Sequence, residues 1–228
     1  MKIFNLKLSY FIVQFGTGII GLAFFIAIAF TKKNKPKYFD YIFIFIILGL
    51  LISFNTIVNN YNSWQLNMKI PILIEQILLL FQFFFIGCFF IRILNEPIIK
   101  KRIKIAIILS ISIQTALIIF ILSTNIEIKP VLTSCLFSLV FCYMYFKDLM
   151  SKKPTLNLLN SSSFWIVMGI LYSSCIGIPV HALITFIPRN SEFINLRRHI
   201  FSITNMSLIV FYIFIIKSYL CLKHPQNL

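Results

Sequence analysis

Apolar residues in this chain occur in long runs separated by short polar segments. Seven of these runs approach the roughly 20 residues that a helix needs to cross a hydrocarbon layer about 30 Å thick. Their approximate bounds are 9–30, 41–59, 71–94, 105–123, 130–146, 164–187 and 200–220. The runs are too long and too uniformly apolar for barrel strands. The pattern predicts an all-α membrane protein, with residues 1–228 forming one bundle of seven transmembrane helices.

Composition supports the bilayer as the environment of the chain. Hydrophobic residues make up 59% of the 228 positions, 26 residues are Phe, and the mean hydropathy is +0.92. A water-soluble globular domain does not need such a balance. The net charge of +15 would suggest nucleic acid in a soluble protein. Here Lys and Arg cluster between the apolar runs, where they act as topology signals, so we expect no nucleic-acid partner.

The distribution of Lys and Arg predicts the orientation of the bundle. Fourteen lie on the side that includes the loop after the first run and the C-terminus, and seven lie on the other. The positive-inside rule then places the N-terminus outside and the C-terminus in the cytoplasm. The first run ends in Ala27–Ala29, which loosely fits a signal-peptide cleavage site. Cleavage would move the lysines at 32–37 outside, against this bias, so we expect no cleavage.

Glu75 is an unusual residue because it is a carboxylate inside an apolar run. It follows Pro71, a favourable first-turn residue, and should lie about one turn inside the membrane. Ionisable groups at that depth are functional candidates by default. Two interpretations remain open. Glu75 either belongs to a functional site, or it reaches the outer head groups or caps the first turn, where the helix dipole favours an acid.

Other polar residues of the runs fall mostly in the same, outer half of the predicted bundle. The candidate ligand-binding residues are Gln14, Asn55, Asn59, Glu75, His181, His199 and Asn205. They are interpreted either as a pocket open to the exterior or as an interhelical hydrogen-bond network that holds the helices together. Apart from Lys and Arg near the ends, the inner halves are expected to be almost free of polar groups.

Catalytic and metal-binding patterns are not found. The five cysteines lie inside apolar runs without CxxC or His-Cys spacing, which indicates packing roles. No HExxH motif, nucleophile elbow or phosphate-binding loop occurs. The remaining acids lie in or beside loops without a convergent pattern; they are Asp40, Glu96, Glu127, Asp148 and Glu192. We therefore expect no enzyme activity, no metal and no cofactor.

Several short motifs resemble a family of uncharacterised seven-helix membrane proteins from Bacteroidota. The stretches are FWIVMGILYSSCIGIPVHALITFI, NLRRHIFSITNMSLIVFYIFIIKSYLC and PILIEQILLL. The matching positions are Phe164, Trp165, Ile166, Gly169, Glu75 and His199. Where family members tend to have Tyr-Phe-Ser-Gly, this chain has Tyr-Ser-Ser-Cys at 172–175. The resemblance implies a bacterial inner-membrane location and a distant likeness to the membrane sensor modules of histidine kinases, but no activity.

Three functions follow from these observations. In the first, the protein is a receptor-like sensor whose outer pocket binds a small ligand or a proton. It would signal to a separate cytoplasmic protein, such as a histidine kinase or regulator. The docking candidates are Lys100, Lys101, Arg102 and Lys104, placed in the third loop, although a topology signal in contact with anionic lipid is the simpler explanation for them. The alternatives are a small-solute or proton-coupled transporter and a structural scaffold without a ligand.

The predicted orientation can be tested with epitope tags on the two ends. We expect antibody to label an N-terminal tag on intact spheroplasts and a C-terminal tag only after permeabilisation, because an odd number of spans puts the ends on opposite sides. Labelling of both tags from the same side would contradict the seven-span topology.

Overall fold

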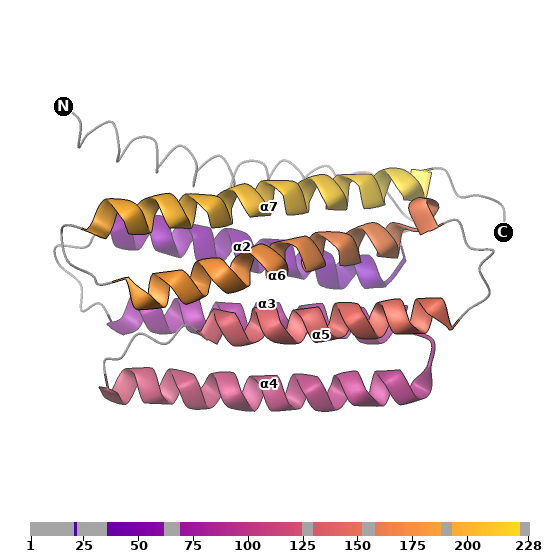
Figure 1. Ribbon diagram of the computed structural model, residues 1–228, viewed down its shortest axis with the longest axis horizontal. Coiled ribbons are helices and arrows are strands. Elements are labelled where there is room, and N and C mark those ends of the chain that lie inside the picture. Colours follow the sequence, from indigo (N-terminus) through magenta and orange to yellow (C-terminus); the bar gives the residue numbers. More distant parts are fainter. Residues whose placement is uncertain are drawn as a thin grey trace.

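The computed structural model describes residues 21, 36–61, 69–124, 130–151, 158–187 and 193–223. Every regular element in these segments is helical, which confirms the all-α prediction for this part of the chain. The elements are α2 (Tyr38–Tyr61), α3 (Lys69–Ile93), α4 (Pro97–Thr124), α5 (Pro130–Met150), the short η1 (Leu158–Asn160), α6 (Ser162–Phe186) and α7 (Ile194–Lys223). Successive helices run in opposite directions along a common axis (Figure 1).

Prolines mark two of the helix starts. Pro97 and Pro130 are the first residues of α4 and α5, where the missing proline N–H has no intrahelical partner to lose. The expected start of the fourth run at Ile105 is therefore wrong by eight residues. Hydropathy stops at the charged stretch, but the backbone continues as a helix through it. The docking candidates Lys100, Lys101, Arg102 and Lys104 accordingly lie on the first two turns of α4 and not in a loop.

Helix packing is built from neighbouring pairs. α6 packs on α7 and α5, α3 packs on α2, α4 and α5, and α4 also packs on α5. The rings of Phe45 on α2 and Phe211 on α7 meet edge to face, with centroids 5.5 Å apart. α4 lies at one edge of the bundle and α7 at the other (Figure 1). Sequence neighbours are thus mostly spatial neighbours, as short connections require.

One face of α4 is buried along most of its length. The buried positions recur every three or four residues, as one helix face requires, at Ile99, Ile103, Ile107, Ser110, Gln114 and Ile118. The opposite face is apolar and open, with Ile108 66% and Ile119 63% exposed. α4 is therefore apolar on both its packed face and its free face, which is typical of a helix that meets lipid.

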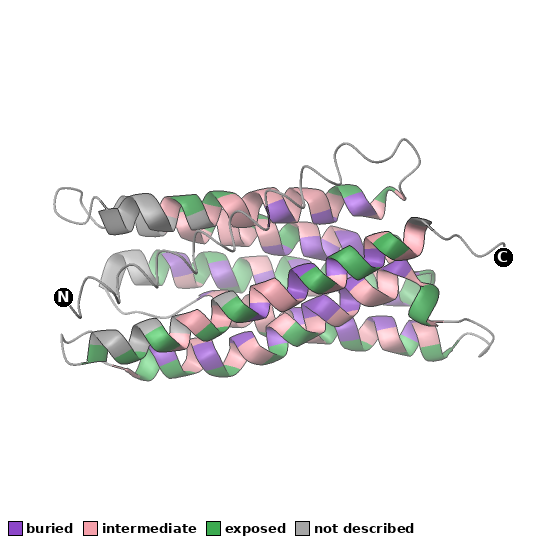
Figure 2. Ribbon diagram, turned by 90° about the horizontal axis from the view of Figure 1, so that it is seen from above, coloured by how far each residue is buried: buried purple, intermediate pink, exposed green. Residues whose placement is uncertain are grey.

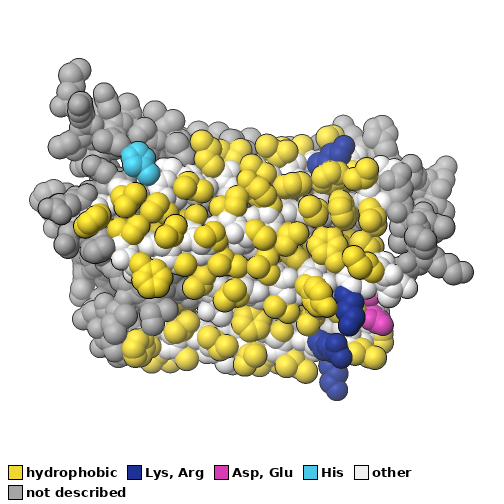
Figure 3. Space-filling model, viewed as in Figure 1, with side chains coloured by type: hydrophobic (Ala, Val, Ile, Leu, Met, Phe, Trp, Pro, Cys, Tyr) yellow, Lys and Arg dark blue, Asp and Glu magenta, His cyan; other side chains and the backbone are white. Residues whose placement is uncertain are grey.

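The surface of the bundle is that of a membrane protein. Five of the described helices, α3 to α7, are long and apolar enough to cross a membrane. The apolar stretch Tyr38–Ile52 of α2 is shorter, although the whole helix has 24 residues. Hydrophobic side chains cover the middle of the face in Figure 3, whereas its Lys, Arg, Asp and Glu side chains lie near one end. The protein is therefore a multi-pass membrane protein in contact with the lipid bilayer.

Six of the seven predicted runs coincide with these helices. The first run, 9–30, lies outside the described residues except for Gly21. Gly21 is buried, and a Cβ built on it would lie 3.1 Å from the Tyr212 hydroxyl oxygen and 3.2 Å from Cδ2 of Leu50. This point of the chain therefore contacts both α7 and α2. The count of seven helices stays a prediction.

Side-chain packing is uneven along the bundle axis. The main hydrophobic core joins twenty buried residues from α2 to α7, and all of them belong to the same half, where α2, α4 and α6 begin. Fully buried Phe89, Phe90 and Phe141 are at its centre. Figure 2 shows buried positions on inward faces of the helices. In the opposite half, the described side chains of α3 at 73–82 are all half-buried or exposed.

Gly87 should be essential for the contact between α3 and α4. A Cβ built on it would lie 2.6 Å from Cγ1 of Ile107, whose branched side chain is stiff in a helix. We expect Gly87→Ala to destabilise the protein by about 1–3 kcal/mol through overpacking. Heating in detergent followed by gel filtration measures the loss of folded protein.

Gly49→Ala is the matched control, since its Cβ would meet only Gln82 Nε2, at 3.2 Å. Both substitutions gain the same helix propensity. The double variant Gly87→Ala, Ile107→Ala should lose less stability than the sum of the two single losses, because Ile107→Ala opens the space that the new methyl group needs. Equal stability of the two single glycine variants would contradict the close contact.

Candidate functional site

The predicted outer-half residues lie at one end of the bundle, where α2 and α6 end and α3 and α7 begin. Glu75 on α3, Asn55 on α2 and His181 on α6 are half-buried, whereas His199 on α7 is exposed. Gln14 lies outside the described residues. Asn59 and Asn205 lie in α2 and α7, but their side chains are also outside the described part. That these residues bind a ligand stays a prediction.

His181 lies on the side of α6 that packs against α5. A Cβ on Gly177, one turn earlier, would lie 3.0 Å from the Cys135 sulfur of α5 and 3.8 Å from Cδ2 of His181. The backbone oxygen of His181 accepts a hydrogen bond from the Thr185 hydroxyl at 2.9 Å. Glu75 is on α3, which also packs on α5. The two residues therefore approach this end of the bundle from helices that share α5 as a neighbour.

Pro179 falls inside α6, two residues before His181. The helix continues through it to Phe186. Proline has no N–H, so the carbonyl of Cys175 lacks its usual helical partner. A helix weakened at this point deforms more easily than its neighbours.

A buried amide joins α4 to α5 in the same half. Gln114 is 1% exposed, its Nε2 donates to the Ser110 hydroxyl at 2.9 Å, and its Oε1 accepts from the Ser134 hydroxyl at 3.1 Å. The sequence places Ser134 among the polar residues of the predicted outer half, but its pattern of apolar runs does not single out Gln114 and Ser110. Their spacing of four residues on the buried face of α4 is the signal that identifies them. This is an interhelical hydrogen-bond network of the kind that holds membrane helices together.

The opposite end of the bundle holds a second polar cluster, formed mostly by residues just outside the predicted runs. The Tyr38 hydroxyl of α2 shares a hydrogen bond with the Ser162 hydroxyl at the start of α6. The Tyr145 and Ser163 hydroxyls are 3.2 Å apart, and those of Ser163 and Ser161 are 3.0 Å apart. Three consecutive serines thus connect the start of α6 to α2 and α5.

Asp148 is the deepest acid of this cluster. It is 3% exposed, near the end of α5, and its Oδ1 accepts a hydrogen bond from the backbone N–H of Glu96 at 3.2 Å. Glu96 immediately precedes Pro97, the first residue of α4. A carboxylate beside a helix N-terminus is stabilised by the unpaired N–H groups and the helix dipole there. Asp148 therefore fixes the turn between α3 and α4 to α5, and is not the loop acid that the sequence suggested.

Trp165 anchors the neighbouring surface of α6. Its indole nitrogen donates to the Leu159 backbone oxygen at 2.7 Å, and its ring stacks on Phe214. The Lys217 ammonium nitrogen lies 5.8 Å from the centre of the Trp165 ring. These contacts connect η1, α6 and α7 at the end that carries the described basic residues.

Within the described residues, no group of three or more His, Cys, Asp or Glu side chains is placed to hold a metal ion. The chain matches no known family model, no curated protein and no solved structure. The resemblance to the Bacteroidota family stays a prediction. The function of the chain therefore has to be inferred from its own residues.

Asp148 should contribute to stability through its hydrogen bond. We expect Asp148→Ala to destabilise the protein by about 1 kcal/mol, because it removes the side-chain acceptor of the Glu96 N–H. Asp148→Asn keeps an oxygen in the same place and should lose less. Thermal unfolding in detergent monitored by gel filtration gives the order of the three proteins. Equal losses for Ala and Asn would mean that the charge, and not the hydrogen bond, stabilises this turn.

Proposed function

We propose that this protein is a receptor-like membrane sensor without catalytic chemistry of its own. Its loosely packed half around Glu75 takes up a proton or a small polar ligand. The resulting helix shift is transmitted to the basic end and recognised there by a separate signalling protein, such as a histidine kinase or regulator. The basic end faces the cytoplasm in this proposal, as the positive-inside rule predicts.

The contrast in packing between the two halves is the observation that supports the proposal most strongly. The described side chains around Glu75 on α3 are half-buried or exposed over 73–82, whereas Phe83, Phe89 and Phe90 of the same helix are buried. Oε1 of Gln76, next to Glu75, is buried without a hydrogen-bond partner among the described residues. A buried acceptor of this kind favours a donor that arrives from outside the protein.

In this proposal one half of the bundle binds the ligand or proton, and the other half transmits the movement. Binding of a ligand or a proton near Glu75 changes the side-chain contacts in the loosely packed half of the bundle. Rearrangement of that half costs little free energy. The aromatic core of the other half behaves as a rigid block, because close-packed side chains transmit displacement instead of absorbing it. Weakened hydrogen bonding at Pro179 gives α6 a place to bend between the two.

Trp165 is a natural reporter for this transmission. The chain has two tryptophans, Trp64 and Trp165, so Trp64→Phe leaves one fluorophore at the basic end. We expect a reversible shift of Trp165 emission in nanodiscs when the solution is taken from about pH 7.5 to about pH 3.5, a range that spans the ordinary pKa values of glutamate and histidine side chains. Glu75→Gln should abolish most of the shift, because it removes the proton-binding group.

Asp40→Asn is the matched control. It removes one carboxylate at the opposite end of the bundle and should leave the shift intact. A silent Trp165 in the Trp64→Phe parent, or the same loss in both variants, would refute the proposal. Proton flux in liposomes that slows in Glu75→Gln would support the transporter alternative. A Glu75→Gln protein that no longer folds would support the structural network.

A further inference from the structure

Positive charge is concentrated at one end of the bundle. Every Lys and Arg whose side chain the structure describes lies there, at Lys37, Arg92, Lys100, Lys101, Arg102, Lys104, Lys147 and Lys217. Figure 3 shows its dark blue side chains gathered at this end. The acids there are Asp40, Glu96 and Asp148, of which Asp148 is buried against the start of α4. The exposed charge at this end is therefore strongly positive.

The lysines of α4 lie on the side of the bundle as well as at its basic end. Ile99 and Ile103 are 4% and 0% exposed; beside this buried face, Lys100 is half-buried and Lys104 is exposed. Lys100 and Lys104 are four residues apart and share one flank of the helix. Lys104 lies about 10 Å along α4 from Pro97. The exposed Ile108 follows on the same flank, so the cations lead directly into lipid-facing apolar surface.

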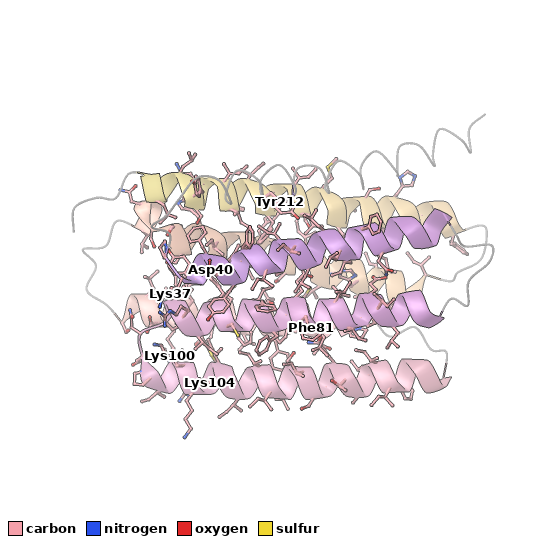
Figure 4. All side chains as sticks on the ribbon, turned by 180° about the vertical axis from the view of Figure 1, so that it is seen from behind. Lys37, Asp40, Phe81, Lys100, Lys104 and Tyr212 are labelled. Atoms are coloured by element: carbon pink, nitrogen blue, oxygen red, sulfur yellow. The ribbon has the colours of Figure 1, made fainter. Side chains whose placement is uncertain are left out.

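The neighbouring helix has the same arrangement. Arg92 is exposed in the last turn of α3 and shares a face with Phe81, because eleven residues make about three helical turns. Phe81 and Phe84 on this face are 50% and 39% exposed. Lys37, Lys100 and Lys104 lie at the same end in the view of Figure 4, where α2, α3 and α4 are side by side in front. Cations of α3 and α4, together with Lys37 just before α2, thus lie at the end of an apolar surface of α3 and α4.

We propose that this face binds one anionic phospholipid. Arg92, Lys100 and Lys104 hold the phosphate, and the acyl chains lie along Phe81, Phe84 and Ile108. A lipid fits better than a soluble acidic partner, because the cations continue into side chains that a bilayer covers. Basic surfaces between membrane helices bind anionic head groups through the same combination of charge and depth. This inference depends on the membrane location of the bundle and not on its proposed role as a sensor.

Native mass spectrometry of protein released from mixed nanodiscs tests the site. The discs contain phosphatidylcholine and phosphatidylglycerol in equal amounts, and the lipids retained by each variant are counted. We expect wild-type protein to retain one phosphatidylglycerol in preference to phosphatidylcholine. The double variant Lys100→Gln, Lys104→Gln should bind it about twentyfold more weakly, since each lysine near an anionic surface contributes about fivefold.

The double variant Lys147→Gln, Lys217→Gln is the matched control. It removes the same charge at the same end, but from α5 and α7. It should retain the lipid nearly as well as the wild type. Equal loss in both double variants would overturn the proposal in favour of unspecific attraction. So would equal retention of the two lipids by the wild type, or displacement of the retained lipid by millimolar inorganic phosphate, which would indicate a site for free anions.

Discussion

The absence of water around the middle of the bundle is the constraint on which the rest of the structure depends. Backbone N–H and C=O groups in that layer have only each other as partners, so the described segments fold into helices with short connections. Hydrophobicity alone does not determine which side of a helix packs inside the bundle, because the packed side and the exposed side of α4 are both apolar. Association between the helices must then come from close side-chain packing and from hydrogen bonds across helices.

These two sources of association are distributed differently along the bundle. Aromatic packing around Phe90 and Phe141 dominates the half with the basic residues, where the Tyr38 and Ser162 hydroxyls also connect α2 to α6. In the other half, the Gln114 amide bridges α4 and α5 while α3 keeps few buried side chains. Among the described side chains, the half with the basic residues is therefore the more extensively packed, and this difference supports the proposed sensor.

The sequence is sufficient to predict the helices but not the contacts between them. Hydropathy locates the helices because the length of an apolar run is itself the physical requirement for a span. It fails at the start of α4, since it averages over all faces, whereas burial of Ile99 and Ile103 concerns only one. The bond between Tyr38 and Ser162 joins residues 124 positions apart, and no local pattern connects them. The role of Asp148 cannot be predicted from the sequence for the same reason, because its hydrogen-bond donor is the backbone N–H of Glu96, in a distant turn.

Trp165 also determines how deeply the protein sits in its membrane. An indole that binds a backbone carbonyl on one edge and lies beneath an ammonium group is most stable at the boundary between hydrocarbon and head groups. The far boundary then crosses α6 about twenty residues later, close to Thr185. His181 then lies about 6 Å along α6 from this boundary, on the side of the helix that packs against α5. A shift in the vertical position of the bundle would expose or submerge this imidazole without any change in the fold.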